Sequence, residues 1–257
     1  MEPIFRVDGD RVVTSRDAAG PWDPRMQHGS APAALVVWAA EAIPTPVPMR
    51  IARVTIDLMR PVPVAPLTVE RGVLREGRKI QLCGVRLKAD GVVVVSANVL
   101  KIKQQTAELP HGIADLPVGL PAPDQCMVEP GNLASSPFVK CISMRAARGR
   151  FGELGPGAIW FRVDHPLIAG AAVSQAMRAV VASDFSNGTS PVLDFSRWTF
   201  INADLTVSLA REPVGDWILL DGESWIGPDG AGLAMSRLAD QRGYFGQAIQ
   251  SLVIERR

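Results

Sequence analysis

Several classes of protein are excluded by what this sequence lacks. Only three of its 257 residues are cysteines, an odd number whose spacing fits no metal site. We therefore expect reduced thiols and a cytoplasmic protein. No apolar run approaches the roughly 20 residues that span a bilayer, and the partly acidic N-terminus does not look like a secretory signal. The sequence predicts no membrane span.

A surplus of charge of either sign is also missing. The chain has 27 Lys and Arg against 26 Asp and Glu, and no basic stripe stands out, so nucleic acid is not expected as a partner. No serine lies in a G-x-S-x-G elbow, and no phosphate loop or Rossmann fingerprint opens a helix. Clusters with metal-ligand spacing are absent as well. We expect neither a metal nor a cofactor.

What the sequence does contain is two similar halves. Each has a helix of small and apolar residues, Ala31–Ile43 in the first half and Ala171–Phe185 in the second, followed by strands. The predicted strands are 5–14 (a hairpin), Ile51–Met59, Leu67–Glu76, Lys79–Ala89 and Val92–Lys103, then Ala158–Val163, Leu205–Ala210, Trp217–Trp225, Gly232–Asp240 and Tyr244–Glu255. The stretch VTIDLMRP (Val54–Pro61) matches LTVSLAREP (Leu205–Pro213). This match indicates an internal duplication about a pseudo-twofold axis.

The repeated order predicts an α+β fold. A sheet wrapped around a central helix buries that helix on all sides and accounts for its apolar composition. Ser30 is expected to be the N-cap of the first helix, with Pro32 in its first turn. Proline and glycine interrupt every pattern between the halves. We predict an N-terminal unit at 1–105, a connector at 106–157 with one strand at Phe138–Met144, and a C-terminal unit at 158–257.

Asp184 is the most conspicuous residue of the second helix. It is a lone carboxylate near the end of an apolar helix, followed by the helix-stop signal Ser186-Asn187-Gly188. Burial of the charge is costly unless it is paired, and the C-terminal end of the helix dipole disfavours it. A residue that breaks two local rules is a candidate for function.

Two amides can join this carboxylate. In the last strand, Gln250 alternates onto the face of two apolar residues, which predicts that it points toward the helix. The first half has Asn98 at the matching place. Asn202 lies near a strand start, where a bulge could aim it inward. Asp184, Asn202 and Gln250 would then hold a water, with the carboxylate as proton acceptor. The alternative is a solvated helix-end Asp184 with two unrelated amides.

At the start of the first helix stands His28-Gly29-Ser30. Free backbone N–H groups at a helix N-terminus stabilise a developing negative charge, and glycine permits close approach. This pattern is typical of an oxyanion site. The alternative is an ordinary helix start with a surface histidine. His165, near the equivalent place in the second half, is interpreted as structural.

The chain resembles the double hotdog acyl-CoA thioesterases of the TesB type over nearly its whole length. The most telling stretches are HGSAPAALVVWAAEAI, VTIDLMRPVPVAPLTVERGVLREGRKIQL, FINADLTVSLAREP and WIGPDGAGLAMSRLADQRGYFGQAIQSLVIE. The resemblance implies hydrolysis of fatty acyl-CoA without a metal or a covalent serine. It implies that Asp184, Asn202 (Thr in the best-known members) and Gln250 hold the attacking water. It also implies that His28-Gly29 binds the thioester carbonyl, through the backbone N–H groups of Gly29 and its neighbour.

The leading hypothesis is therefore an acyl-CoA thioesterase that takes acyl-CoA or an acyl carrier as substrate, with the acyl chain in a tunnel between the halves. A non-catalytic acyl- or lipid-binding protein of the same fold is the alternative. A hotdog hydratase needs a histidine shortly after the catalytic Asp, and Phe185–Ser190 contains none. Because hotdog sheets expose an edge, we also expect a homodimer or higher homo-oligomer.

Overall fold

The computed structural model describes residues 1–110, 112–113, 116–129 and 136–257. The first half contains β1 (Phe5–Asp8), β2 (Arg11–Thr14), the 3-10 helix η1 (Arg16–Ala18), α1 (Ser30–Glu41), β3 (Met49–Leu58), β4 (Leu67–Glu76), β5 (Ile80–Ala89) and β6 (Val92–Lys103). The remainder contains η2 (Pro123–Gln125), β7 (Met127–Val128), η4 (Val139–Cys141), β8 (Ile142–Arg148), β9 (Gly157–Val163), α2 (Gln175–Ser183), α3 (Ser186–Thr189), β10 (Trp198–Asn202), β11 (Asp204–Leu209), β12 (Trp217–Ile226), β13 (Ala231–Asp240) and β14 (Gly243–Arg256).

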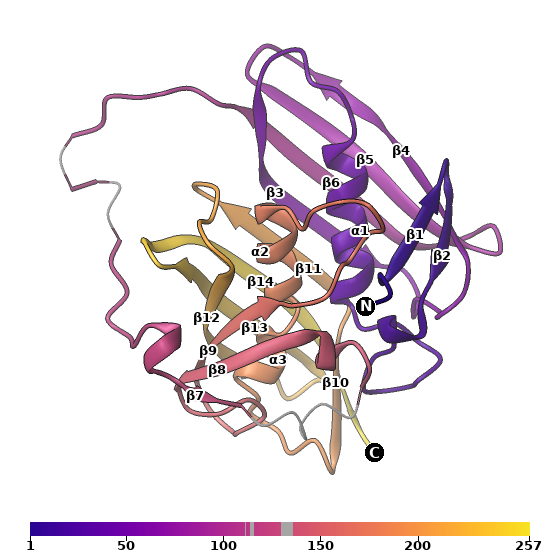
Figure 1. Cartoon of the computed structure of the whole chain (residues 1–257). Helices are drawn as coiled ribbons and strands as arrows, with labels where there is room; N and C mark the ends of the chain where they lie inside the picture. The colour runs from indigo at the N-terminus through magenta and orange to yellow at the C-terminus, as the bar shows by residue number, and fades with distance from the viewer. Residues whose placement is uncertain (111, 114–115, 130–135) are drawn as a thin grey trace.

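The strands form one sheet of 14 in the order β1-β2-β4-β5-β6-β3-β11-β14-β13-β12-β9-β8-β7, with β10 also paired to β14. All the pairings between these strands are antiparallel. α1 packs on the strands of the first half, and α2 and α3 pack on those of the second (Figure 1). The predicted α+β fold, with two repeats whose strands each wrap a central helix, is confirmed, and the strands of both repeats join in one sheet.

α1 is the buried helix that its composition predicts. Ten of its twelve residues are buried, because the sheet encloses one side and α2 covers another. The prediction that Ser30 is its N-cap is wrong. Gly29 holds that place, and Ser30 is the first helical residue, with a hydroxyl that donates to the carbonyl of Val181. The Ser30 hydroxyl therefore bonds to the second half of the chain and does not cap its own helix.

α2 is shorter than the predicted helix over 171–185. Ser174 is its N-cap and accepts a hydrogen bond from the Met177 N–H, so residues 171–174 stay outside the helix. The expected stop at Ser186-Asn187-Gly188 is also wrong, because these residues form the short helix α3. The break between the two helices falls at Asp184 and Phe185. The carboxylate therefore lies at a junction of two helices.

The two halves meet at β3 and β11, and their pairing shows the duplication directly. Thr55 pairs with Thr206, and Val54 pairs with Val207. Each half also carries one irregularity at the same place: Ala52 is extra in the pairing of β3 with β6, and Ala203 is extra where β10 and β11 pair with β14. A pseudo-twofold axis therefore passes between β3 and β11.

The connector ends in strands of the second half. The strand expected at 138–144 lies later, at β8, because residues 139–141 form η4, and β8 pairs with β9. The division at 105 and 157 stays a prediction. Within the described residues, no helix is both long and apolar enough to cross a bilayer.

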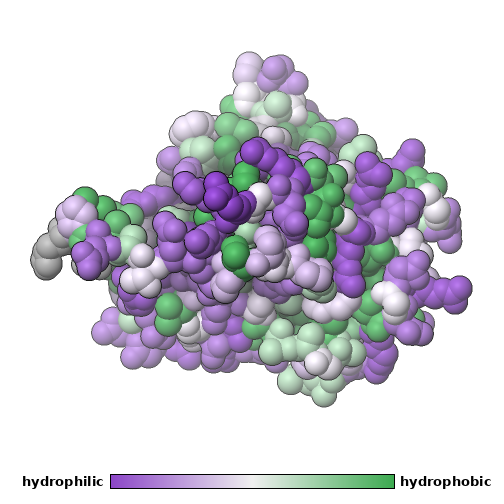
Figure 2. All heavy atoms as spheres, turned by 90° about the horizontal axis from the view of Figure 1, so that it is seen from above, coloured by the Kyte–Doolittle hydropathy of each residue, from purple (hydrophilic) through white to green (hydrophobic). Residues whose placement is uncertain are grey.

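The cysteine side chains and the protein surface are both consistent with a well-filled core. The three cysteines are free, and burial raises the pKa of the Cys141 thiol to about 11, which keeps it protonated at neutral pH. Apolar and polar residues intermingle over the face seen in Figure 2.

Candidate functional site

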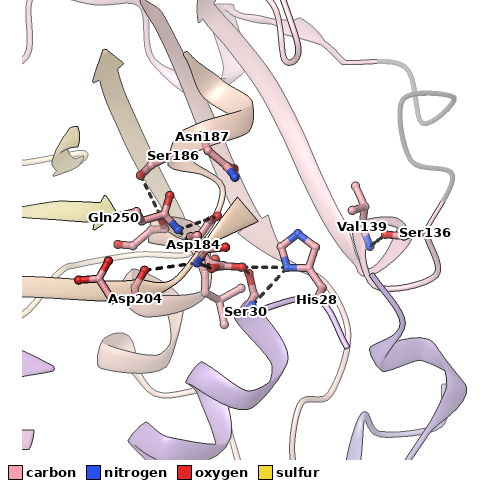
Figure 3. Close-up of polar contacts among 12 residues, drawn as sticks. His28, Ser30, Ser136, Val139, Asp184, Ser186, Asn187, Asp204 and Gln250 are labelled. Carbon is pink, nitrogen blue, oxygen red and sulfur yellow. Dashed lines mark hydrogen bonds and ion pairs between the residues drawn. The ribbon is translucent and has the colours of Figure 1, made fainter. Parts of the chain in front are cut away.

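The carboxylate that the sequence singles out is buried at the junction of α2 and α3. Asp184 is the C-cap residue of α2, and only 5% of it is exposed. A buried carboxylate that lacks hydrogen-bond donors is costly, so its surroundings decide what it can do. Donors reach it from both halves of the chain (Figure 3).

One oxygen of Asp184 faces the two amides that the sequence predicts. Its Oδ1 accepts from Asn202 Nδ2 at 2.9 Å and from Gln250 Nε2 at 3.3 Å. Asn202 points inward because the extra residue Ala203 changes the register between β10 and β11 against β14. Gln250 points inward by regular strand alternation and is fully buried. The structure brings the predicted three residues together, so the alternative of a solvated Asp184 with unrelated amides does not hold.

Gln250 also offers an acceptor that the protein does not use. Its Nε2 donates to Asp184, to the side chain and to the backbone carbonyl. Its Oε1 is buried and has no hydrogen-bond partner among the described residues. Buried polar atoms are nearly always paired with protein or with water. A small hydroxyl-bearing molecule beside the Asp184 carboxylate would satisfy this oxygen.

The other oxygen of Asp184 faces residues from the first half. The Oδ2 atom lies 3.0 Å from His28 Nδ1 and 3.2 Å from the Ser30 hydroxyl. The His28 ring stacks between Phe138 and Phe185, with centroid distances of 5.1 and 4.6 Å. Nδ1 also lies 3.2 Å from the Ser30 N–H. At this distance the Ser30 N–H donates to Nδ1, which holds the ring beside the carboxylate.

Gly29 lies against the carboxylate at the N-terminus of α1. A Cβ placed there would be 2.7 Å from Oδ1 and 2.8 Å from Oδ2 of Asp184, closer than real Cβ contacts. Glycine is therefore the residue that this approach permits. The Gly29 N–H donates to no acceptor in the part of the chain that the structure describes. The predicted oxyanion donor thus lies next to the predicted base.

The sequence missed the two side chains that come from the first half. His28 was expected to act through the backbone, with a surface ring as the alternative, but its side chain is 11% exposed and touches Asp184. Ser30 was expected to cap its own helix. The signal for both was present in HGS, which precedes an apolar helix, but nothing local indicates that this helix start meets the end of α2.

Matches to family models show to which protein family this chain belongs. Residues 18–102 match the acyl-CoA thioesterase N-terminal domain, and residues 118–254 match the acyl-CoA thioesterase C-terminal domain. The chain belongs to the acyl-CoA thioesterase family. No curated protein sequence matches this member of the family.

Solved structures agree with this fold. A putative thioesterase from Novosphingobium aromaticivorans is 20% identical, with a TM-score of 0.73 over 98% of this chain and 99% of that one. The acyl-CoA thioesterase II TesB2 of Mycobacterium marinum is 14% identical, with a TM-score of 0.65 over 94% and 97%. A hot dog fold protein from Alicyclobacillus acidocaldarius is 17% identical, with a TM-score of 0.75 over 98% and 95%. The α+β fold is therefore a double hotdog.

In this thioesterase-family chain, the two amides that face Asp184 occur in the second half only. When the extra residues Ala52 and Ala203 are aligned, Ile51 takes the place of Asn202, and Val99 takes the place of Gln250. Asn98, which we expected to match Gln250, matches Ile249 instead and is exposed. The sequence comparison was wrong there because it slid β6 by one residue against β14, whereas the pairings keep for Val99 and Gln250 the same spacing that relates Thr55 to Thr206.

Proposed function

We propose that this member of the family hydrolyses acyl-CoA thioesters to a free acid and CoA. The observation that carries the proposal is the pair of amide donors on Asp184 Oδ1, beside Gln250 Oε1, an acceptor that has no partner among the residues that the structure describes. A water between Oε1 and the carboxylate would donate one proton to each. Such a water is oriented for attack and has a base in contact with it.

The reaction then needs no covalent intermediate with the protein. Asp184 takes a proton as the water oxygen bonds to the thioester carbonyl carbon, and the carbonyl oxygen becomes an oxyanion. Collapse of this tetrahedral intermediate breaks the C–S bond. The proton held by Asp184 goes to the departing CoA sulfur, which leaves the acid and the thiol and returns the carboxylate.

The negative charge that forms on the carbonyl oxygen can be met by the helix start. The Gly29 N–H lies at the N-terminus of α1, where aligned peptide dipoles give a partial positive charge. Stabilisation of an oxyanion by such preorganised N–H groups is a large contribution to acyl transfer. The close approach of Gly29 to Asp184 supports the proposal that this donor and the base act on one substrate carbonyl.

His28 and Ser30 act as positioning residues. Both contact Oδ2, the carboxylate oxygen that does not face the amides. Their contacts fix the rotation of the carboxylate, and the stack of His28 between two phenylalanines fixes the ring. Oδ1 is thereby left oriented toward the amides.

The remaining predictions belong to the same proposal. We infer a metal-independent reaction, a cytoplasmic protein of lipid metabolism, and a homodimer or higher homo-oligomer. Either acyl-CoA or an acyl carrier can present the same thioester.

Thiol release tests the function directly. We expect the purified protein to release CoA from acyl-CoA substrates, measured with a chromogenic thiol reagent over acyl chains of two to sixteen carbons. Calorimetric titration with the same substrates is the companion measurement. Binding without thiol release would favour the alternative, an acyl- or lipid-binding protein, and would contradict hydrolysis.

Replacing Asn202 with Asp is expected to lower activity at pH 7 by about 100-fold. The change removes the donor at 2.9 Å and places a second carboxylate there. Two carboxylates so close cannot both be ionised, so they share a proton until the pH is raised. The pH–rate profile should therefore move its rising limb to higher pH. Asn202→Thr, which keeps a donor and adds no charge, is the matched control and should leave the profile in place.

A further inference from the structure

The β-bulge that turns Asn202 inward carries a second carboxylate. Ala203 and Asp204 both lie opposite Ser251, because the pairing of β10 with β14 and the pairing of β11 with β14 differ in register by one residue. Leu205 is buried in the core, so strand alternation places Asp204 on the outer face of the sheet. Asn202 and Asp204 therefore lie on opposite faces of the sheet, with one residue between them.

The Asp204 carboxylate binds a backbone N–H group of the neighbouring strand. The Ser251 N–H donates to Asp204 Oδ1 at 2.5 Å, where a regular antiparallel ladder uses a backbone carbonyl. The Ser251 carbonyl accepts from the Ala203 N–H at 2.9 Å. A hydrogen bond from a backbone N–H to a carboxylate is charge-assisted and stronger than one between neutral groups. Ser251 thus binds both residues of the bulge, which fixes the backbone at this point.

The Asn202 amide connects this bulge to Asp184 on the inner face. Its Nδ2 donates to Asp184 Oδ1 at 2.9 Å and to the backbone carbonyl of Asp204 at 3.4 Å (Figure 3). An asparagine NH₂ group has two hydrogens, so it can make both contacts. The direction of the amide therefore depends on where the backbone of Asp204 lies.

Asp204 is an unfavourable residue for the sheet itself. It lies directly opposite Asp57 of β3, and like charges directly opposite each other destabilise a sheet. Aspartate is also depleted in strands. The hydrogen bond from the Ser251 N–H is the contact of this side chain that can offset these costs.

The first half has the same bulge without a carboxylate. Ala52 is its extra residue. Arg53 takes the place of Asp204 and pairs with Leu100. A guanidinium group has no acceptor, so it cannot accept from the Leu100 N–H. The chain therefore forms this bulge without an acidic side chain, and the acidic residue is present only in the half that holds Asn202.

We propose that Asp204 is a positioning residue for the hydrolysis. By binding the Ser251 N–H on the outer face, it fixes the backbone that directs the Asn202 amide toward Asp184 on the inner face. The proposal rests on the proposed function, because it takes Asp184 as the base. Asp204 itself touches no reacting atom, and its effect reaches Asp184 through the backbone and through Asn202.

Removal of the carboxylate tests this role. Asp204→Ala should lower kcat for acyl-CoA hydrolysis about 10-fold and leave KM within about twofold of wild type, since the change acts on the attacking water and not on substrate binding. Asp204→Asn keeps an oxygen that can accept from the Ser251 N–H, so its kcat should lie within about threefold of wild type. Asp204→Arg copies the first half and places a cation opposite Asp57. It should therefore fold even if Asp204→Ala does not, with the same loss of kcat.

Asp57→Ala is the matched control, because Asp57 is the exposed carboxylate on the opposite strand, and this variant should keep the wild-type kcat. A second readout, which does not require hydrolysis, is the exchange of the Asn202 side-chain amide with water, measured by NMR. The chain has four asparagines, so selective labelling resolves this amide, and its loss in Asn202→Ala assigns it. Exchange should be about 10-fold faster in Asp204→Ala and Asp204→Arg than in wild type or Asp204→Asn.

The two readouts separate the positioning role from the hydrolysis. If wild type releases no thiol but the amide exchanges faster in Asp204→Ala and Asp204→Arg, hydrolysis fails and the positioning of Asn202 by Asp204 holds. If the folded variants keep the wild-type amide exchange or, with an active wild type, the wild-type kcat, the proposal is overturned. It is also overturned if Asp204→Asn behaves like Asp204→Ala, because the hydrogen bond to Ser251 is then not the cause.

Discussion

Replacing Asp184 with Asn should lower acyl-CoA hydrolysis by about 1,000-fold. An asparagine amide cannot take a proton from water, so the attacking water loses its base. The fold should persist, because the new side chain has the same shape and its oxygen can still accept from Asn202 and Gln250. The measurement is thiol release at saturating substrate, together with a thermal unfolding midpoint for each protein.

Asp90→Asn is the control for that change. Asp90 lies at an exposed turn, so the same change of Asp to Asn can be made there away from the site. Its φ of 48° is one that asparagine also tolerates. Its variant should hydrolyse at the wild-type rate. An Asp184→Asn variant that is folded and fully active would remove Asp184 from the mechanism.

Gly29→Ala is expected to lower kcat/KM by about 100-fold, although alanine suits the backbone at this position. Gly29 has φ −57° and ψ −27°, a helical conformation that any residue adopts. The added methyl group would lie 2.7 Å from Asp184 Oδ1 and 2.8 Å from Oδ2. The carboxylate must move away from this methyl group. It then loses its contacts with the two amides, with His28, or with both. Thiol release over a series of substrate concentrations measures the loss.

Gly72→Ala provides the matched glycine control. A Cβ at Gly72 meets no atom within 4 Å, so this variant should keep both activity and stability. Wild-type kcat/KM in the Gly29→Ala protein would show that the position of the carboxylate relative to the α1 N-terminus does not matter. The oxyanion role of the Gly29 N–H would then lose its structural support.

Residues that break a local rule were predictable from the sequence. Asp184 was found because a carboxylate at the end of an apolar helix is unfavourable twice over. Gln250 was found because strand alternation places it on a buried face, and it is fully buried. Asn202 needed a bulge to point inward, and the extra residue Ala203 supplies it. Each of these features can be recognised within a single helix or strand.

Contacts between elements far apart in the chain were not predictable. The His28 ring and the Ser30 hydroxyl reach Asp184 only because the start of α1 meets the end of α2. Hydrophobic periodicity predicts both helices but says nothing about which ends meet. Asn98 was misplaced because the aligned letters of β6 and β14 allow a slip of one residue, which only the pairing of each strand with its neighbours removes. Register is a property of the pairing, not of either strand.

The joint between β3 and β11 has a further consequence. In a dimer of two identical chains, every substitution appears twice and must suit both of its surroundings. Here one polypeptide supplies both halves of the continuous sheet, so symmetry no longer ties Ile51 to Asn202 or Val99 to Gln250. One half is free to specialise in holding a helix start, and the other in holding a carboxylate and its two amides.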